Sequence, residues 1–520
     1  MEGERNARRG TVAVHRKKTS RREAENRESN IMVRAIMLQG TGSDVGKSVL
    51  VAGLCRVAHR RGIAVRPFKP QNMSNNAAVA SIPGSVTMGE IGRAQWLQAQ
   101  ACSVKPSVDM NPVLIKPESD TGAQIVVQGR PLGFSAARDY QSLKGRLLDA
   151  VMESFTRLSA DADLVIVEGA GSPAEINLRD RDIANMGFAT RAKVPVVLVG
   201  DIDRGGVIAA LAGTHRILDE ADRAMIVGYL INKFRGDLTL FDEGLEAIGR
   251  FTGWRSFGVV PWLREVAALP AEDTVTLART PPVGQARLKV VVPMLSRIAN
   301  FDDLDPLAAE PEVEVVFVPP GRRLPSDADL IVLPGTKSTI ADLAFLRVQG
   351  WEDDLRALRS KGTGIVGLCG GYQMLGRSIS DPEGIEGAAG EVPGLGFLDV
   401  ETVMRSEKTV REVTAHSARY DVPLEGYEIH IGDTRGDDCS SPVAMIGNRA
   451  DGATSRDGRV WGSYLHGLFS ADAFRRSFLA ERGISSSTTS YRDGVEKALD
   501  ALAERLEEHI DCDALLAAAR

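Results

Sequence analysis

Short segments rich in valine and isoleucine alternate with helix-like stretches along most of the chain, and this alternation limits the possible fold more than any other feature. A first series covers residues 35–38, 63–68, 164–167, 194–199, 224–231 and 257–260. A second series covers residues 288–292, 313–317, 330–333 and 364–368. Such strands, when separated by helices, form a mostly parallel sheet with helices on both faces. The pattern predicts an α/β protein with two doubly wound domains, whose ligands bind outside the carboxyl ends of the strands.

The length of 520 residues is more than one hydrophobic core usually organises, which also favours several domains. Residues 280–285, which contain two prolines and a glycine, are typical of a linker. We expect the units of the chain to cover residues 32–280, 288–482 and 483–520. Residues 1–31 are polar and rich in arginine, and they are predicted to be a disordered basic extension or to precede a true start at Met32.

The last unit is predicted to be helical, because apolar residues recur on one face of a helix at Val495, Leu499, Leu502, Leu506 and Ile510. This stripe is typical of a helix that packs against its own protein, and a partner-binding helix is the alternative.

Bulk composition excludes several classes of protein. Hydrophobic residues make up 43% of the chain and charged residues 25%, as in ordinary globular proteins. The net charge of −6 gives no support for nucleic-acid binding. No apolar run approaches the roughly 20 residues that a membrane helix needs. The five cysteines form no CxxC pair, which favours the reducing cytoplasm over a disulfide framework.

A cysteine between small residues is the strongest chemical signal in the second half. Residues 367–371 read Gly-Leu-Cys-Gly-Gly, between an apolar strand and a helix-like stretch. At such a corner the sulfur of Cys369 can reach solvent, and the start of the helix favours the thiolate. The amide of Gly370 would then lie where an oxyanion forms, and His466 is a candidate base. The alternative is an inert, buried cysteine.

A phosphate-binding loop is predicted after the first strand, because a glycine-rich segment ends in Lys47 and Ser48 where a helix begins. Backbone amides, a lysine and a hydroxyl that can bind Mg²⁺ are what a nucleoside triphosphate requires. The candidate nucleotide-binding residues are Gly40, Gly42, Gly46, Lys47 and Ser48. The spacing from Gly40 to Gly46 is one residue longer than in the usual P-loop, and a plain glycine turn is the alternative.

Glu168 ends the third strand and is a candidate Mg²⁺ ligand, because it should face the same crevice as this loop. Asp44 is a weaker candidate that can instead cap a helix. Asp201 and Asp203, at another strand end, can hold a metal, position an arginine or cap a helix.

Several strings together resemble the cobyric acid synthase family. They lie at residues 69–76, 168–178, 200–206, 231–237, 333–339, 367–371 and 464–467, and the similarity extends from about residue 32 to 518. The resemblance implies a dethiobiotin-synthetase-like ATP domain followed by a class I-type glutamine amidotransferase domain. The phosphate loop of dethiobiotin synthetase normally has this longer spacing, so the extra residue between Gly40 and Gly46 agrees with the resemblance.

The resemblance also implies functions for individual residues. Cys369 and His466 match the nucleophile and base, and Glu168 matches the acidic Mg²⁺ position. The amide of Gly370, with one from the turn at Gly335 and Thr336, would hold the oxyanion. Typical class I amidotransferases carry a carboxylate two residues after the histidine, where this chain has Leu468. The group that orients His466 is therefore left open.

The reaction implied is the amidation of the b, d, e and g carboxylates of (adenosyl)cobyrinic acid a,c-diamide, in cobalamin biosynthesis. Four glutamines would supply ammonia and four ATP would activate the carboxylates, with Mg²⁺ as cofactor and with no obligate protein, nucleic-acid or membrane partner implied. Candidate ligands of this polyanionic corrinoid are the arginines Arg93, Arg179, Arg181 and Arg204, each of which can equally be a surface or ion-pair residue. His430 is expected near the glutamine pocket or in a structural role.

Three other functions share part of this pattern. Cobyrinic acid a,c-diamide synthase has the same two-domain plan, but the strings at 71–76 and 200–206 favour the first interpretation. A ParA-like ATPase has a similar phosphate loop but has no use for a glycine-flanked thiol with a distant histidine. A peptidoglycan or other amidotransferase subunit is the third.

Overall fold

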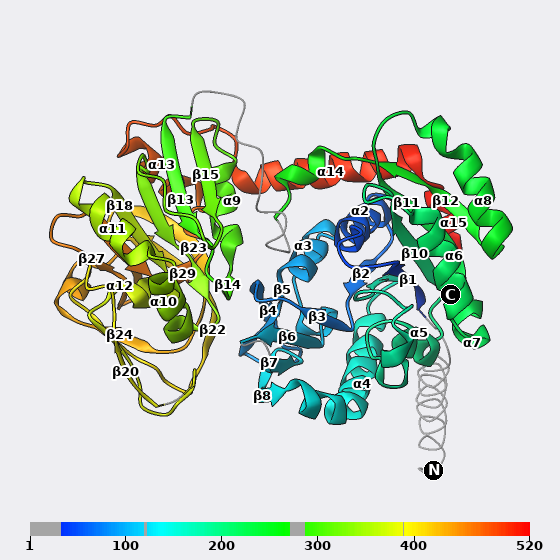
Figure 1. Ribbon diagram of the computed structural model, residues 1–520, viewed down its shortest axis with the longest axis horizontal. Coiled ribbons are helices and arrows are strands. Elements are labelled where there is room, and N and C mark those ends of the chain that lie inside the picture. The colour runs from blue at the N-terminus through cyan, green and yellow to red at the C-terminus, as the bar shows by residue number, and fades with distance from the viewer. Residues whose placement is uncertain (1–32, 119–121, 271–285, 388) are drawn as a thin grey trace, which may run out of the picture.

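The computed structural model describes residues 33–118, 122–270, 286–387 and 389–520. Figure 1 shows two α/β units side by side, with the C-terminal helix crossing from the second unit back to the first. The predicted extension at 1–31 and the predicted linker at 280–285 lie outside the described residues, and the domain bounds stay predictions.

The first unit contains a sheet of six parallel strands, in the order β12-β11-β10-β1-β9-β2. All six predicted strands are present, as β1 Arg34–Gly40, β2 Val65–Phe68, β9 Leu164–Glu168, β10 Val196–Asp201, β11 Ile226–Phe234 and β12 Arg255–Pro261. Successive residues of β1 are buried on opposite faces: Ile36 and Leu38 lie in one apolar cluster, Ala35 and Met37 in the other. The sheet is therefore covered on both faces, which confirms the doubly wound prediction.

Helices and short 3₁₀ turns connect these strands. The helices are α2 Lys47–Arg60, α4 Ala137–Ser159, α5 Met186–Ala192, α6 Val207–Ile217, α7 Glu220–Ala224 and α8 Asp242–Thr252, and the turns are η2 Ile176–Arg181, η3 Leu238–Phe241 and η4 Glu265–Ala268.

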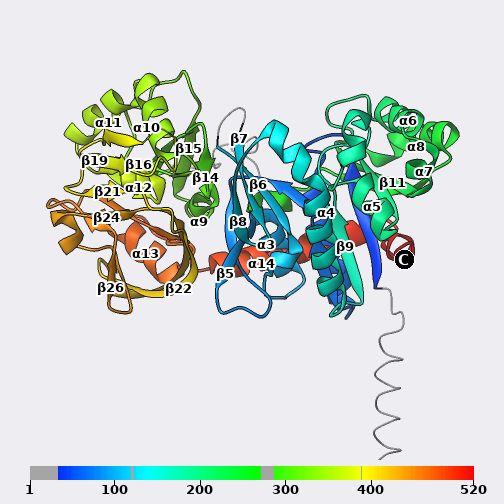
Figure 2. The same cartoon turned by 90° about the horizontal axis from the view of Figure 1, so that it is seen from below.

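Between β2 and α4 the chain forms a β-rich insertion that the sequence did not predict. It contains a four-stranded sheet, a hairpin, one helix and one turn: β3 Gln71–Met73, β6 Val113–Pro117, β7 Gly122–Val127, β8 Arg130–Ala136, β4 Ala77–Ser81, β5 Met88–Gly92, α3 Arg93–Ala101 and η1 Val108–Met110. Its strands are short, and polar residues interrupt them. In Figure 2 this insertion lies between the central sheet and the second unit.

The second unit has its own central sheet, in the order β15-β13-β16-β18-β28-β27, and only β27 runs antiparallel. The strands are β13 Leu288–Pro293, β15 Val313–Val318, β16 Leu330–Leu333, β18 Gly364–Leu368, β27 Ala453–Thr454 and β28 Val460–Ser463, and they include all four predicted ones. The helices are α9 Asp305–Ala308, α10 Thr339–Val348, α11 Trp351–Ser360, α12 Gly370–Leu375 and α13 Asp472–Ala480, and the turns are η6 Phe301–Leu304 and η7 Asp437–Ser440.

Smaller antiparallel and mixed sheets fill the rest of this unit, as its β-rich, glycine-punctuated sequence indicated. They are formed by β14 Ile298–Ala299, β17 Gly335–Thr336, β19 Ser378–Asp381, β20 Gly390–Pro393, β21 Glu401–Val403, β22 Thr409–Ser417, β23 Val422–His430, β24 Asp433–Arg435, β25 Ala444–Ile446, β26 Arg449–Asp451 and β29 Leu465–His466.

The C-terminal helix α14, Tyr491–His509, packs on the first unit along α2, and α15, Cys512–Ala517, follows it. The predicted apolar stripe from Val495 to Ile510 is buried in the cluster that α2 shares with the sheet, which confirms the packing helix. Arg56 of α2 is paired with Glu496 and Asp500 of α14.

The two units also meet directly through the insertion. Ala77, Val79 and Leu114 of the first unit form one apolar cluster with Ile429 of β23. Such a shared cluster fixes the insertion against the sheet that carries His466. Within the described ranges, no helix has both the length and the apolar character needed to cross a bilayer.

Candidate active sites

Cys369 lies at the corner between β18 and α12, as the sequence predicted. Its φ of +51° and ψ of −111° are unusual for a residue with a side chain, and such strain is typical of nucleophiles held at sharp turns. Neighbouring glycines make the corner possible: an added Cβ on Gly371 would lie 2.1 Å from the carbonyl oxygen of Leu333. The thiol is partly exposed, with Sγ 3.6 Å from the carbonyl oxygen of Ile429. The inert, fully buried alternative does not fit this geometry.

His466 in β29 lies beside this thiol, and the thiol contributes to the raised pKa of the imidazole. On the opposite side of the ring, Nδ1 is 2.6 Å from Oδ2 of Asp303. Oδ1 of Asp303 accepts a hydrogen bond of 2.7 Å from the amide of Gly467, so both carboxylate oxygens are fixed. Asp303 is therefore the orienting group that the sequence left open.

The buried position of His466 opposes protonation, but the Asp303 carboxylate outweighs this effect and raises the pKa of His466 well above its usual value. The ring of Tyr427 stacks on the imidazole at 5.1 Å between centroids. A fixed, readily protonated imidazole next to a thiol can accept the thiol proton and hold it beside the resulting thiolate.

Gly370 and the short strand β17 lie together next to the thiol. An added Cβ on Gly370 would lie 3.3 Å from the backbone nitrogen of Thr336. Beside the ladder of β14 and β17, the amide of Lys337 donates to the carbonyl oxygen of Arg297. Hydrogen-bonded and non-hydrogen-bonded pairs alternate along an antiparallel ladder, so the next pair, Thr336 with Ile298, is a non-hydrogen-bonded one. The amide of Thr336 thus points out of the ladder, whereas Gly335 occupies a hydrogen-bonded position opposite Ala299. Of the two residues in the predicted turn, the geometry favours Thr336 as the oxyanion donor.

Polar side chains surround the space next to the thiol. Gln373 donates to the carbonyl oxygen of Ile431 and to Tyr464. Glu386 accepts from the amide of Ile340, and burial raises its pKa to about 7. The ring of His430 stacks on Tyr464 at 3.9 Å. His430 therefore lies near the site, which was one of the two predictions made for it.

The predicted phosphate loop connects β1 to α2. Gly46 has a φ of +93°, which a side chain would disfavour, and helix α2 begins at Lys47. The amine of Lys47 is buried and donates to the carbonyl oxygens of Gly42 and Gly171, at 3.2 and 3.4 Å. It thus lies in the hollow of the loop, where the β- and γ-phosphates of a nucleotide would bind.

Glu168 ends β9 directly beside this loop. Ser48 Oγ donates to it at 2.7 Å and Gln98 Nε2 at 2.6 Å, and Lys69 pairs with it at 2.7 Å. The hydroxyl and the carboxylate therefore fit a Mg²⁺ ion that also binds phosphates and waters. Among the described residues, no group of three or more His, Cys, Asp and Glu side chains is arranged to hold a metal by itself. Sequence reasoning missed Lys69 and Gln98 as partners of Glu168.

The other acidic candidates are engaged in ion pairs. Asp44 is 3.3 Å from Arg204, Asp201 is 2.8 Å from Lys233, and Asp203 is 2.6 Å from Arg235. The contact of Asp203 supports the predicted positioning of an arginine, Asp201 positions a lysine instead, and the ion pair of Asp44 was not among its predicted roles.

Three of the candidate corrinoid-binding arginines, Arg93, Arg179 and Arg204, are engaged in ion pairs. Arg179 pairs with Asp222 at 2.5 Å, and Arg181 is exposed. Arg93 forms a 2.8 Å ion pair with Asp302 of the second unit.

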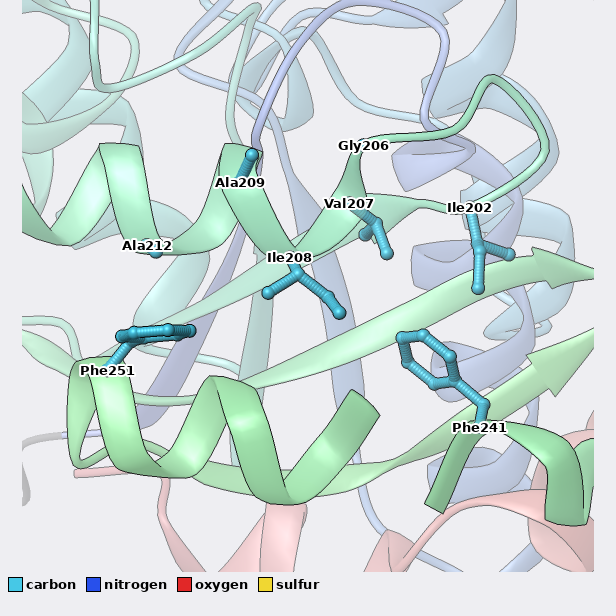
Figure 3. Close-up of a pocket in the computed structure, with 8 residues that line it drawn as sticks. All are labelled: Ile202, Gly206, Val207, Ile208, Ala209, Ala212, Phe241 and Phe251. Atoms are coloured by element: carbon cyan, nitrogen blue, oxygen red, sulfur yellow. The ribbon is translucent and has the colours of Figure 1, made fainter. Parts of the chain in front are cut away.

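An open apolar pocket of about 580 Å³ lies between α6 and α8 (Figure 3). Its walls include Ile208, Phe241 and Phe251, whose side chains point toward one another. None of the predicted site residues lines it, so its apolar walls supply no group for phosphate or thiol chemistry.

Asp303 is the functional residue that sequence reasoning missed in the second unit. It lies in the string Asn-Phe-Asp-Asp-Leu-Asp at 300–305, shortly after β13. This acidic cluster near a strand end was a usable signal, but nothing in it distinguishes Asp303 from its two acidic neighbours.

Two family models match the chain. The one described as the CobQ/CobB/MinD/ParA nucleotide binding domain matches residues 36–277, and the one described as the CobB/CobQ-like glutamine amidotransferase domain matches residues 289–474. Among the most similar relatives, a cobyric acid synthase of Mesorhizobium japonicum is 67% identical over 94% of this chain and 100% of the relative. A cobyric acid synthase of Brucella anthropi is 66% identical over 93% of this chain and 99% of the relative.

Among solved structures, the MinD cell division protein of Aquifex aeolicus matches 45% of this chain and 84% of that chain, with 12% identity and a TM-score of 0.27.

Proposed function

The chain belongs to the cobyric acid synthase family of glutamine-hydrolysing ligases, and from this premise we propose that it amidates a corrinoid polycarboxylate with ammonia taken from glutamine. The proposed substrate is (adenosyl)cobyrinic acid a,c-diamide, and its b, d, e and g carboxylates become amides at the expense of ATP. The observation that carries the proposal is the triad of Cys369, His466 and Asp303 in the same chain as a complete phosphate loop.

The second unit would release ammonia. Cys369 attacks the side-chain amide of glutamine after His466 has accepted the thiol proton. The amides of Gly370 and Thr336 hold the oxyanion of the tetrahedral intermediate, and loss of one such donor typically costs about 10²–10³ in rate. His466 then returns the proton to the departing nitrogen. Water hydrolyses the thioester that remains and restores the thiol.

The first unit would join this ammonia to the corrinoid. A substrate carboxylate attacks the γ-phosphate of ATP, and Lys47 neutralises charge on the transferring group. Mg²⁺, held by Ser48 and Glu168, would neutralise further charge on the phosphates. Ammonia then displaces phosphate from the acyl phosphate and gives the amide.

The contacts between the units support transfer of ammonia from one site to the other. Lys337, next to the Thr336 amide, pairs with Glu118 of the insertion at 2.5 Å, and Ser338 donates to the carbonyl oxygen of the same residue. Lys408 of the second unit pairs with buried Glu90 at 2.5 Å. Ammonia that reached bulk water would be protonated, so an enclosed passage through this contact region is expected.

The test compares glutamine and ammonium as nitrogen donors with the purified full chain, ATP, Mg²⁺ and the a,c-diamide corrinoid. Mass spectrometry should show four successive amidations with either donor. The Cys369→Ala variant should lose glutamine-driven amidation and keep ammonium-driven amidation. Loss of both activities in a folded variant would contradict the two-site proposal. Preference for the unamidated corrinoid would instead identify a cobyrinic acid a,c-diamide synthase.

A further inference from the structure

The aspartate that completes the triad lies on a short segment held by the first unit. Asp303 belongs to η6, which begins after Asn300. The backbone of Asn300 has a φ of +52°, and its amide donates to Oδ1 of Asn76 at 2.7 Å. Its side chain donates to the carbonyl oxygen of Ala77 at 2.7 Å and to the hydroxyl of Tyr427 at 2.9 Å. The start of η6 is thus fixed by residues of the first unit and is joined to the tyrosine that stacks on His466.

A second contact holds the middle of η6. Arg93, at the start of α3, lies 2.8 Å from the carboxylate of Asp302, and the side chains are 12% and 5% exposed. Asp302 and Asp303 are adjacent and both buried, so the charge of one disfavours the charge of the other. Burial raises the pKa of Asp302, Arg93 opposes this shift, and Asp303 adds to it. Without the guanidinium, Asp302 would be an unpaired buried carboxylate next to the one that His466 requires.

Helix α3 connects this ion pair to the phosphate loop. Arg93 is its first residue, and five residues further along Gln98 donates to Glu168 at 2.6 Å and to the backbone of Ser48 at 3.2 Å. Gln95 also reaches Glu168, at 3.5 Å. One nine-residue helix therefore touches both the proposed Mg²⁺ ligands and the segment that presents Asp303.

We propose that Arg93 of the nucleotide-binding unit is a positioning residue for glutamine hydrolysis. It holds Asp302 so that Asp303 alone faces His466, and α3 makes this alignment depend on nucleotide at Ser48 and Glu168. The proposal rests on the proposed function, because it concerns the same two sites. Nucleotide and Mg²⁺ held by Ser48 and Glu168 would restrain the carboxylate that Gln98 of α3 contacts, and this restraint would strengthen the hold of α3 on η6.

The first experiment measures glutaminase activity of the full-length Arg93→Gln variant. We expect kcat for glutamine hydrolysis to fall about 10–100-fold, the usual effect of removing a partner of an active-site ligand, with KM for glutamine little changed. Arg93→Lys should recover part of the loss because it restores the charge.

The pH profile of glutaminase kcat separates a positioning role from a general loss of packing. The groups that face His466 or its neighbours from the surrounding elements are Cys369, Asp303, Asp302, Tyr427 and Arg93. Removal of the guanidinium changes this charge balance, so the profile of Arg93→Gln should be displaced and that of Arg93→Lys should not.

Arg157→Gln is the matched control, because Arg157 also forms a 2.6 Å ion pair with a buried carboxylate, that of Asp109, and both of these residues belong to the first unit. It should leave glutamine hydrolysis unchanged. Equal losses in Arg93→Gln and Arg157→Gln, or an unaltered rate in Arg93→Gln, would overturn the proposal.

The second experiment adds Mg²⁺ and a non-hydrolysable ATP analogue. Glutaminase activity of the unmodified chain should rise about five-fold or more, in the usual range of coupling between two sites. The rise should disappear in Arg93→Gln and shrink in Gln98→Ala, which removes a contact of α3 with Glu168. No rise in the unmodified chain, or an undiminished rise in both variants, overturns the link through α3. If the unmodified chain hydrolyses no glutamine at all, the proposed function itself fails.

Discussion

Replacement of Asp303 by asparagine should disable the glutaminase while preserving the shape of its site. The amide of Gly467 donates to Oδ1 of Asp303, so the asparagine oxygen must stay there to accept this hydrogen bond. The new NH₂ group then faces Nδ1 of His466. Nδ1 must then accept a hydrogen bond from this NH₂ group, so the neutral imidazole carries its proton on Nε2. The ring in this tautomer cannot accept the thiol proton at Nε2.

The size of the effect follows from the contact that is lost. The 2.6 Å contact joins a carboxylate to an imidazole that carries positive charge during the reaction. Hydrogen bonds to charged groups contribute about 1.5–3 kcal/mol, and two unit charges 4 Å apart interact by about 4 kcal/mol at an effective dielectric constant near 20. A loss of roughly 3–4 kcal/mol from the transition state lowers kcat about 10²–10³-fold.

The assay is glutamate release from glutamine, with ammonium-driven amidation as the internal control. The carboxylate raises the pKa of His466, so the imidazolium in the unmodified chain persists to higher pH than usual. In Asp303→Asn the largest effect that opposes burial is lost and the pKa of His466 falls, so the remaining activity should require alkaline conditions that ionise the thiol directly. A folded Asp303→Asn variant with nearly normal glutaminase activity and an unaltered pH profile would refute the assignment of Asp303.

Two further predictions concern the first unit and its contact with the second. Lys47→Ala should eliminate both glutamine-driven and ammonium-driven amidation, because the amine of Lys47 lies in the hollow of the phosphate loop. Some glutamine hydrolysis should remain. Normal ATP-dependent amidation by this variant would contradict the loop assignment. Glu90 is buried, which raises its pKa, but Lys116 and Lys408 outweigh this effect and lower it from 4.5 to about 2. Its contribution to stability is therefore complete above pH 4.5 and is lost as the pH falls toward 2, so the difference in urea midpoint between the unmodified chain and Glu90→Gln should shrink over that range. A difference that stays constant across the range would show that the Glu90 charge does not hold the units together.

Local sequence was enough to predict the two doubly wound sheets, the phosphate loop and the thiol corner. Each of these features depends on neighbouring residues. The apolar segments fix the strands because both sheet faces are buried, and Lys47 and Ser48 directly follow the glycines that shape the loop. The strained corner at Cys369 likewise requires the adjacent glycines. The sequence also placed Glu168 correctly beside Ser48, because both follow neighbouring parallel strands.

Tertiary structure alone decided which groups serve these residues. Asp303 precedes His466 by 163 residues, and its sequence neighbours Asp302 and Asp305 are chemically identical. Only the turn of η6 and its anchoring by the insertion determine that Asp303 faces the imidazole while Asp302 faces Arg93. The insertion was not predicted, because its strands are short and its contacts join segments more than two hundred residues apart. Spacing along the chain carries no record of such contacts, since they form only when the two units are packed together.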